Sequence, residues 1–133
     1  MLRIVIGIFI ILHGLSHLLF FLQGMRIFEL KSGLLWPDTS WAFSSWMSVD
    51  AIRILASIFS VLVAGGFMLS GIGILTSQDW WRAVIIISAI FSLVLFLVFW
   101  DGSMQDLDAK GVNAVVINTV ILVALLIFKW PDF

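Results

Sequence analysis

Four long apolar runs constrain this chain more than any other feature of its sequence. They cover about residues 3–23, 51–76, 80–100 and 112–129. A helix needs roughly 20 residues, rising 1.5 Å each, to cross the hydrocarbon of a bilayer. None of the runs alternates as a membrane barrel strand does, and backbone polar groups in lipid need partners within their own segment. The sequence therefore predicts an all-α fold in which one membrane domain, residues 1–133, spans the bilayer four times.

The composition indicates that lipid is the solvent for much of the chain. Hydrophobic residues make up 62% of the sequence and charged residues only 11%, whereas a soluble domain carries roughly 25% charged residues. The formal net charge of −1 gives no basic field for nucleic acid. The chain has no cysteine, which excludes disulfides, Fe–S clusters and thiol catalysis.

The connections between the runs predict their arrangement. The stretches 76–79 and 101–111 are short, so neighbouring helices should form an antiparallel bundle with both termini on one side. Basic residues divide evenly between the two sides, and the positive-inside rule gives no preference. We expect both termini in the cytoplasm. At the start of the second run, Ser48 or Asp50 can cap the helix.

The long connection between the first two runs, residues 24–49, is unusually apolar for a loop. It contains Trp36, Trp41 and Trp46. Tryptophan is enriched at membrane interfaces, which favours an interfacial segment resting on lipid. The alternative is a lid over the mouth of the bundle, because long loops are often functional.

Polar side chains within the apolar runs should either form hydrogen bonds with one another or serve a function, because placing them in lipid costs free energy. His13 and His17 lie four residues apart and share one helix face. Antiparallel threading brings further polar side chains to the same half of the bilayer: Arg53, Ser57, Asn118 and Asp101. We interpret these residues as a ligand pocket beneath the loop. The alternative is that they only join the helices to one another.

The histidine pair also raises the question of a metal or a haem. Two histidines at i and i+4 can bind one metal ion, but no carboxylate lies at their depth to complete a ligand set. A haem between two histidines needs them on opposite faces of its ring, whereas His13 and His17 share one helix face. Only a haem shared between two copies of the chain would fit. Proton handling is chemically easier, because histidine ordinarily titrates near neutrality.

The first run resembles the opening helix of DoxX-like membrane proteins. That family shows an Arg, a Gly four residues later and then a His-Gly pair, which Arg3, Gly7, His13 and Gly14 match. His17 stands where the family usually has Lys. Residues 65–71 resemble the family's second-helix glycine pattern, although the acidic residue that often precedes it is absent. The resemblance implies a four-helix bundle associated with membrane redox assemblies, including quinone-linked sulfur oxidation and oxidative-stress complexes.

Together these features favour a small accessory or redox-associated subunit of a prokaryotic plasma membrane that binds a quinone or a lipid. The expected partners are membrane lipid and a membrane protein or a second copy of the chain. One alternative is a structural or assembly subunit without a ligand, and another is a small oligomeric transporter. An enzyme is not expected, because no nucleophile–base pair or complete metal set is visible.

Overall fold

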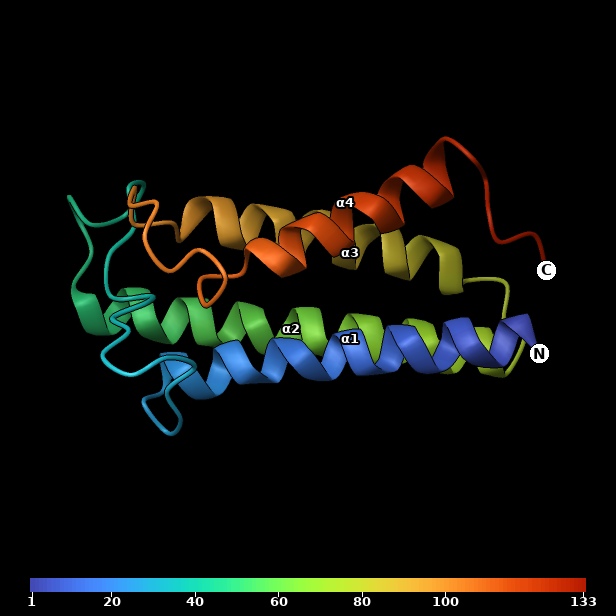
Figure 1. The fold of residues 1–133 in the computed structure, drawn as a ribbon, viewed down its shortest axis with the longest axis horizontal. Coiled ribbons are helices and arrows are strands. Elements are labelled where there is room, and N and C mark those ends of the chain that lie inside the picture. Colours follow the sequence, from blue (N-terminus) through green and yellow to red (C-terminus); the bar gives the residue numbers. More distant parts are fainter.

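The computed structural model describes all 133 residues and contains four helices and no strand. The helices are α1 (Leu2–Gly24), α2 (Val49–Leu75), α3 (Trp81–Val98) and α4 (Val112–Leu126). The predicted all-helical class is confirmed. Figure 1 shows the chain passing back and forth along the long axis, with both termini at one end and the two longer loops at the other.

Three of the helices, α1, α2 and α3, are long and apolar enough to cross a membrane. α4 is apolar but has only 15 residues. At 1.5 Å per residue it is about 22 Å long, which is shorter than a hydrocarbon core of roughly 30 Å. The sequence predicts a run to residue 129, whereas the helix ends at Leu126. Lys129 has a φ of 51°, and this left-handed conformation cannot continue a right-handed helix.

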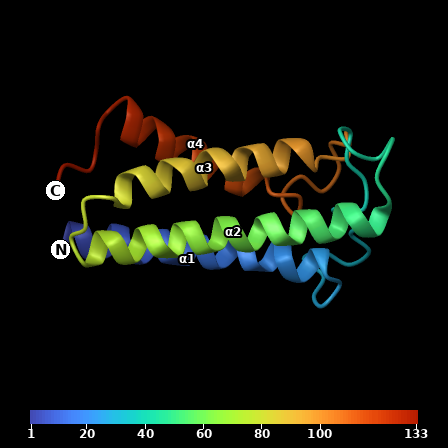
Figure 2. The same cartoon turned by 180° about the vertical axis from the view of Figure 1, so that it is seen from behind.

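The helices pack in the order of the sequence, α1 on α2, α2 on α3 and α3 on α4. No Cα atom of α4 lies within 8 Å of one in α1. The ring of helices is therefore not closed at the α1–α4 seam. Figures 1 and 2 both show the C-terminal part of α4 diverging from the other helices.

Glycines let the backbones of α1 and α2 approach closely at two levels. A Cβ built on Gly14 would lie 2.9 Å from the carbonyl oxygen of Ala64, and one built on Gly71 would lie 2.7 Å from the carbonyl oxygen of Gly7. Real Cβ atoms do not approach backbone this closely. Small residues serve the same purpose between helices in lipid, where close packing drives association.

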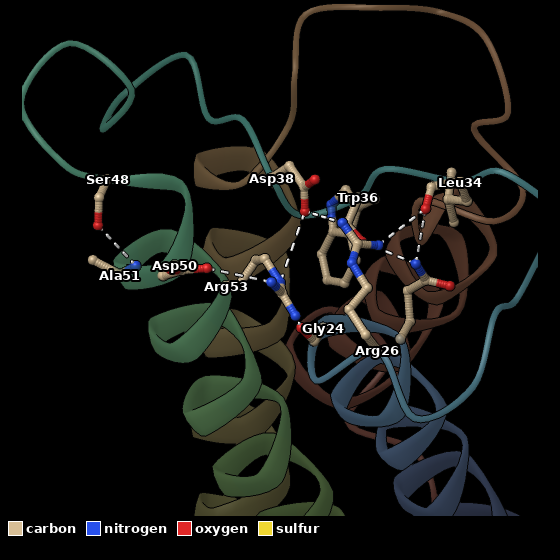
Figure 3. Close-up of polar contacts among 10 residues, drawn as sticks. Gly24, Arg26, Leu34, Trp36, Asp38, Ser48, Asp50, Ala51 and Arg53 are labelled. Carbon is tan, nitrogen blue, oxygen red and sulfur yellow. Dashed lines mark hydrogen bonds and ion pairs between the residues drawn. The ribbon is translucent and has the colours of Figure 1, made fainter.

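Gln23, in the last turn of α1, anchors the long loop that follows. Its side chain is fully buried. Nε2 donates to the carbonyl oxygens of Leu34 (3.1 Å) and Trp36 (3.2 Å), and Oε1 accepts from the backbone N–H of Leu30 (2.8 Å). The loop ends at Ser48, which caps α2 by accepting from the N–H of Ala51 (Figure 3). Both loop ends are thus fixed by side-chain hydrogen bonds.

Candidate functional site

The two histidines lie on consecutive turns of α1 and are buried in the bundle. Their ring centroids are 4.9 Å apart, and both rings pack against Phe67 of α2. A phenyl ring offers no hydrogen bond to their nitrogens. The histidines must therefore find polar partners on the other side, where α3 and α4 lie.

A chain of hydrogen bonds supplies these partners and joins α1 to α3 and α4. Nε2 of His13 lies 2.8 Å from Oδ1 of Asn118, whose Nδ2 donates to Oγ of Ser92 at 2.7 Å. The same Ser92 oxygen lies 2.8 Å from Nε2 of His17. Nδ1 of His17 completes the chain at 3.0 Å from the carbonyl oxygen of His13. Asn118, Ser92 and His17 have no exposed surface.

The partners fix the direction of every bond in this chain when both rings are neutral. A carbonyl oxygen only accepts, so Nδ1 of His17 carries its ring proton and Nε2 of His17 accepts from the Ser92 hydroxyl. Having given its single proton, Ser92 accepts from the amide of Asn118. Oδ1 of Asn118 then faces His13, whose Nε2 must be the donor. The two histidines are therefore opposite tautomers.

The remaining nitrogen, Nδ1 of His13, is an acceptor that has no hydrogen-bond partner in the protein. This nitrogen is not fully buried. The chain beyond it is a poor proton path, because the amide of Asn118 interrupts it and does not release its protons near neutral pH. The geometry suits a fixed acceptor on α1 better than a proton wire.

His13 lines a groove of about 430 Å³ between α1 and α4, in the half nearer the loops. Ser16 and Asn113 add polar groups from these two helices, and Lys31 and Asp108 lie at the loop end. Lys31 forms an ion pair with Asp106, and this hydrogen bond raises the pKa of Lys31. From the long loop between α1 and α2, Leu30 and Lys31 line this groove, and the tryptophans do not.

A second groove of about 320 Å³ continues along the same seam toward the termini. Phe9 and Ile10 of α1 and Val120 and Ile121 of α4 line it one turn from His13 and Ile117. Its lining is wholly apolar and also includes Val5, Ile6, Trp81, Ile85, Ala124, Leu125, Trp130 and Pro131. The seam between α1 and α4 thus contains a polar groove in the half nearer the loops and an apolar groove in the half nearer the termini.

Arg53 does not reach the histidines and lies instead at the loop end of α2. Its Nε donates to the carbonyl oxygen of Gly24 at 3.0 Å and lies 3.9 Å from Asp38. Arg26 forms an ion pair with the same carboxylate. Figure 3 shows both arginine side chains directed toward Asp38. Arg53 therefore helps to hold the long loop against the helix ends.

Ser57 and Asp101 are also placed away from the histidine chain. Ser57 is buried, and its Oγ has no hydrogen-bond partner. Asp101 follows α3 and forms an ion pair with the buried Lys110 at 2.8 Å. Burial alone raises the pKa of the Asp101 carboxyl, but the hydrogen bonds from Lys110 and the N–H of Ser103 outweigh it, and the pKa lies below its ordinary value.

The three tryptophans of the long loop have different surroundings. Trp36 is buried against Phe20 and Phe96, with ring centroids 5.5 and 6.0 Å away. Trp41 and Trp46 are 64% and 68% exposed, and each donates from Nε1 to a backbone carbonyl. Only Trp36 packs into the bundle, so the three residues do not form one cover.

Sequence reasoning missed Ser92, which connects the two histidines to Asn118. Serine in an apolar run is equally typical of close helix packing, and only the rotation of α3 shows which role applies. No group of three or more metal-ligating His, Asp or Glu side chains occurs in the structure. Of the predicted pocket residues, His13, His17 and Asn118 meet, and Arg53, Ser57 and Asp101 do not join them.

Comparison of the chain with protein-family models, with curated proteins and with solved structures found no match. The resemblance to DoxX-like proteins stays a prediction. The function must therefore be argued from the geometry of the α1–α4 seam.

Proposed function

We propose that the protein is an integral membrane protein, an antiparallel four-helix bundle that binds a quinone or a neutral lipid in the groove between α1 and α4. The observation that carries this proposal is the succession of a polar and an apolar groove along one seam. A molecule with a small polar head and a long apolar tail matches this succession. Sites for such ligands are commonly apolar clefts with a few placed polar groups.

The open seam also suggests how a ligand would reach the site. Because no Cα atoms of α1 and α4 come within 8 Å of each other, a tail would enter sideways from the lipid without crossing water. The head would meet His13 and Ser16, and the tail would lie beside Phe9, Ile121 and Trp130. This assignment keeps His13 of the predicted pocket and leaves out Arg53, Ser57 and Asp101, which do not line the groove.

Membrane insertion of all four helices is part of the proposal. α4 is short, but residues 127–130 are apolar apart from Lys129, whose long side chain can reach the interface. A bilayer can also thin locally around a short helix. The exposed Trp41 and Trp46 at the loop end suit an interfacial position. A redox-associated role follows only from the DoxX-like resemblance.

A structural role is the second candidate, and the hydrogen-bond chain favours it. His13, Asn118 and Ser92 link α1, α3 and α4 without any ligand. In that case the chain would serve only to hold the bundle together. The two candidates differ in what happens when the groove is filled.

The test is to fill the apolar groove and to measure binding in nanodiscs. Ala124 lines this groove, so Ala124→Phe should weaken binding of n-decyl benzoquinone, and of its reduced hydroquinone form, by about tenfold or more, equal to about 1.4 kcal/mol. Ala83→Phe is the matched control, because Ala83 is exposed on α3 outside the groove. Absence of binding to the wild-type protein, or equal binding by both variants, would refute the groove assignment and leave the structural role.

A further inference from the structure

We infer that the groove selects ligands that present a hydroxyl group to Nδ1 of His13, so that a quinol or a neutral lipid alcohol binds in preference to its ether or ketone counterpart. This inference rests on the proposed function and names its ligand class. It follows from the direction of the hydrogen bonds that join His13 to Asn118, Ser92 and His17, rather than from the shape of the groove.

The first step is that Nδ1 of His13 is an acceptor. Nε2 of this ring donates to Asn118, and a neutral imidazole carries only one ring proton. Nδ1 therefore has a lone pair and no proton. It has no partner among the protein's hydrogen bonds, and His13 lines the polar groove. A ligand can satisfy this nitrogen only by donating a hydrogen bond to it.

The second step is that the ring of His13 cannot easily reverse its tautomer. Reversal would require Asn118 to flip and present its carbonyl oxygen to Ser92. The Ser92 hydroxyl would then donate to Asn118 and would have no proton left for Nε2 of His17. Nδ1 of His17 still has to donate to the carbonyl oxygen of His13. Reversal would thus leave a buried acceptor unpaired, which costs more than an ordinary hydrogen bond contributes.

The third step concerns charge at the loop end of the groove. Lys31 is the only lysine or arginine in the lining, and it is paired with Asp106. Asp108 lies in the same lining and adds a negative charge. A phosphate headgroup would therefore meet no free cation and would be repelled by a carboxylate. A neutral head with a hydroxyl donor fits these surroundings better.

The experiment compares matched ligands that differ only in the donor. In nanodiscs, n-decyl hydroquinone under reducing conditions is compared with its dimethyl ether, and hexadecanol with its methyl ether. We expect the hydroxyl compound to bind about tenfold more tightly in at least one series. The series that shows the preference identifies the source, quinol or lipid alcohol. Binding should also shift the ¹⁵N resonance of Nδ1 of His13.

The matched variant replaces both partners of one hydrogen bond, His13→Phe together with Asn118→Leu. Removing both avoids an unpaired group, and the bond between Ser92 and His17 remains. In this variant the two members of each pair should bind alike. The wild-type comparison and the ¹⁵N shift decide the question even if the variant does not fold.

Two failures are distinguishable. If ether and hydroxyl compounds bind equally to the wild-type protein while Ala124→Phe weakens the binding of both, the groove is supported as the binding site. The inference that the ligand needs a hydroxyl group is then overturned. Nδ1 of His13 would then be satisfied by water alone. If no compound binds, the proposed function is refuted, and the hydroxyl inference, which rests on it, is refuted as well.

Discussion

Nε2 of His13 donates a hydrogen bond to Oδ1 of Asn118 at 2.8 Å and so joins α1 to α4. The two residues are 105 positions apart in the sequence, and the helices that carry them bring no Cα atoms within 8 Å of each other. The first and last helices are therefore connected by polar side chains rather than by close packing. The proposed binding groove lies along this seam.

The hydrogen-bond chain predicts opposite tautomers for the two histidines. His13 should carry its proton on Nε2 and His17 on Nδ1, because their partners leave no other assignment for neutral rings. One-bond ¹⁵N–¹H couplings in protein labelled at histidine would measure this. His13→Phe leaves the His17 signals for assignment. Finding the same tautomer in both rings would contradict the proposed direction of the chain.

Asn118 should matter more for stability than its neighbour on the same helix. Asn118→Leu leaves Nε2 of His13 without a partner in the core, and we expect a loss of about 1–2 kcal/mol in the free energy of unfolding. Asn113→Leu is the control, because Asn113 is exposed and makes no hydrogen bond through its side chain. Unfolding in mixed micelles by a denaturing detergent gives both values. Equal losses would argue against the chain as a stabilising element.

Close approach of α1 and α2 predicts a sharp difference between two glycines. Gly14→Ala places a Cβ against the backbone of Ala64 and Met68, and we expect it to lower stability by about 1–3 kcal/mol through overpacking. Gly65→Ala meets nothing within 4 Å and should be neutral or stabilising by up to about 1 kcal/mol. Thermal unfolding of the two variants provides the comparison. A tolerated Gly14→Ala would mean that the helices are further apart than described.

The ion pair of Asp101 and Lys110 predicts a pH dependence of stability in the acid range. The pKa of Asp101 is lowered below its ordinary value of about 3.8 in the folded protein, so its stabilising effect is present above that value and is lost as the pH falls through the folded pKa. Asp101→Asn should therefore cost up to about 1 kcal/mol near neutral pH, and the difference should shrink as the pH falls from the ordinary pKa of 3.8 through the lower pKa of the folded protein.

The control for this experiment is Asp50→Asn. Its carboxylate is 84% exposed and lies 3.4 Å from Arg53, so its loss should have little effect at any pH. Equal stability of the Asp101 variant and the wild-type protein across the whole range would show that the pair contributes nothing measurable.

The helices follow from the sequence because length and hydropathy are local properties. Each apolar run becomes a helix, and the starts of α2 and α4 fall within two residues of the expected positions. The end of α4 differs because the regular i→i−4 hydrogen bonding stops at Ile127, and the N–H groups of Phe128 and Trp130 bond to the carbonyl oxygens of Val123 and Ala124 instead. Such a local conformation is not visible in a pattern of apolar residues.

Only part of the candidate site could be predicted from the sequence. Counting residues from the membrane edge places His13, His17 and Asn118 at similar depths, and they do meet. The same count includes Arg53, Ser57 and Asp101, but these lie nearer the loop end than the histidines do: Arg53 and Ser57 are beside Gly24, and Asp101 follows the end of α3. Ser92 was overlooked because depth carries no information about rotation around the helix axis.

The sequence by itself determined that this chain forms four apolar helices and that two histidines share one face of the first, since both properties depend on hydrophobicity and the helical period alone. Only the tertiary structure decided that α1 and α4 leave an open seam, that Ser92 and Asn118 complete the histidine chain, and that Nδ1 of His13 is left as an acceptor. These features depend on helix rotation and spacing, which arise from packing between residues far apart in the sequence.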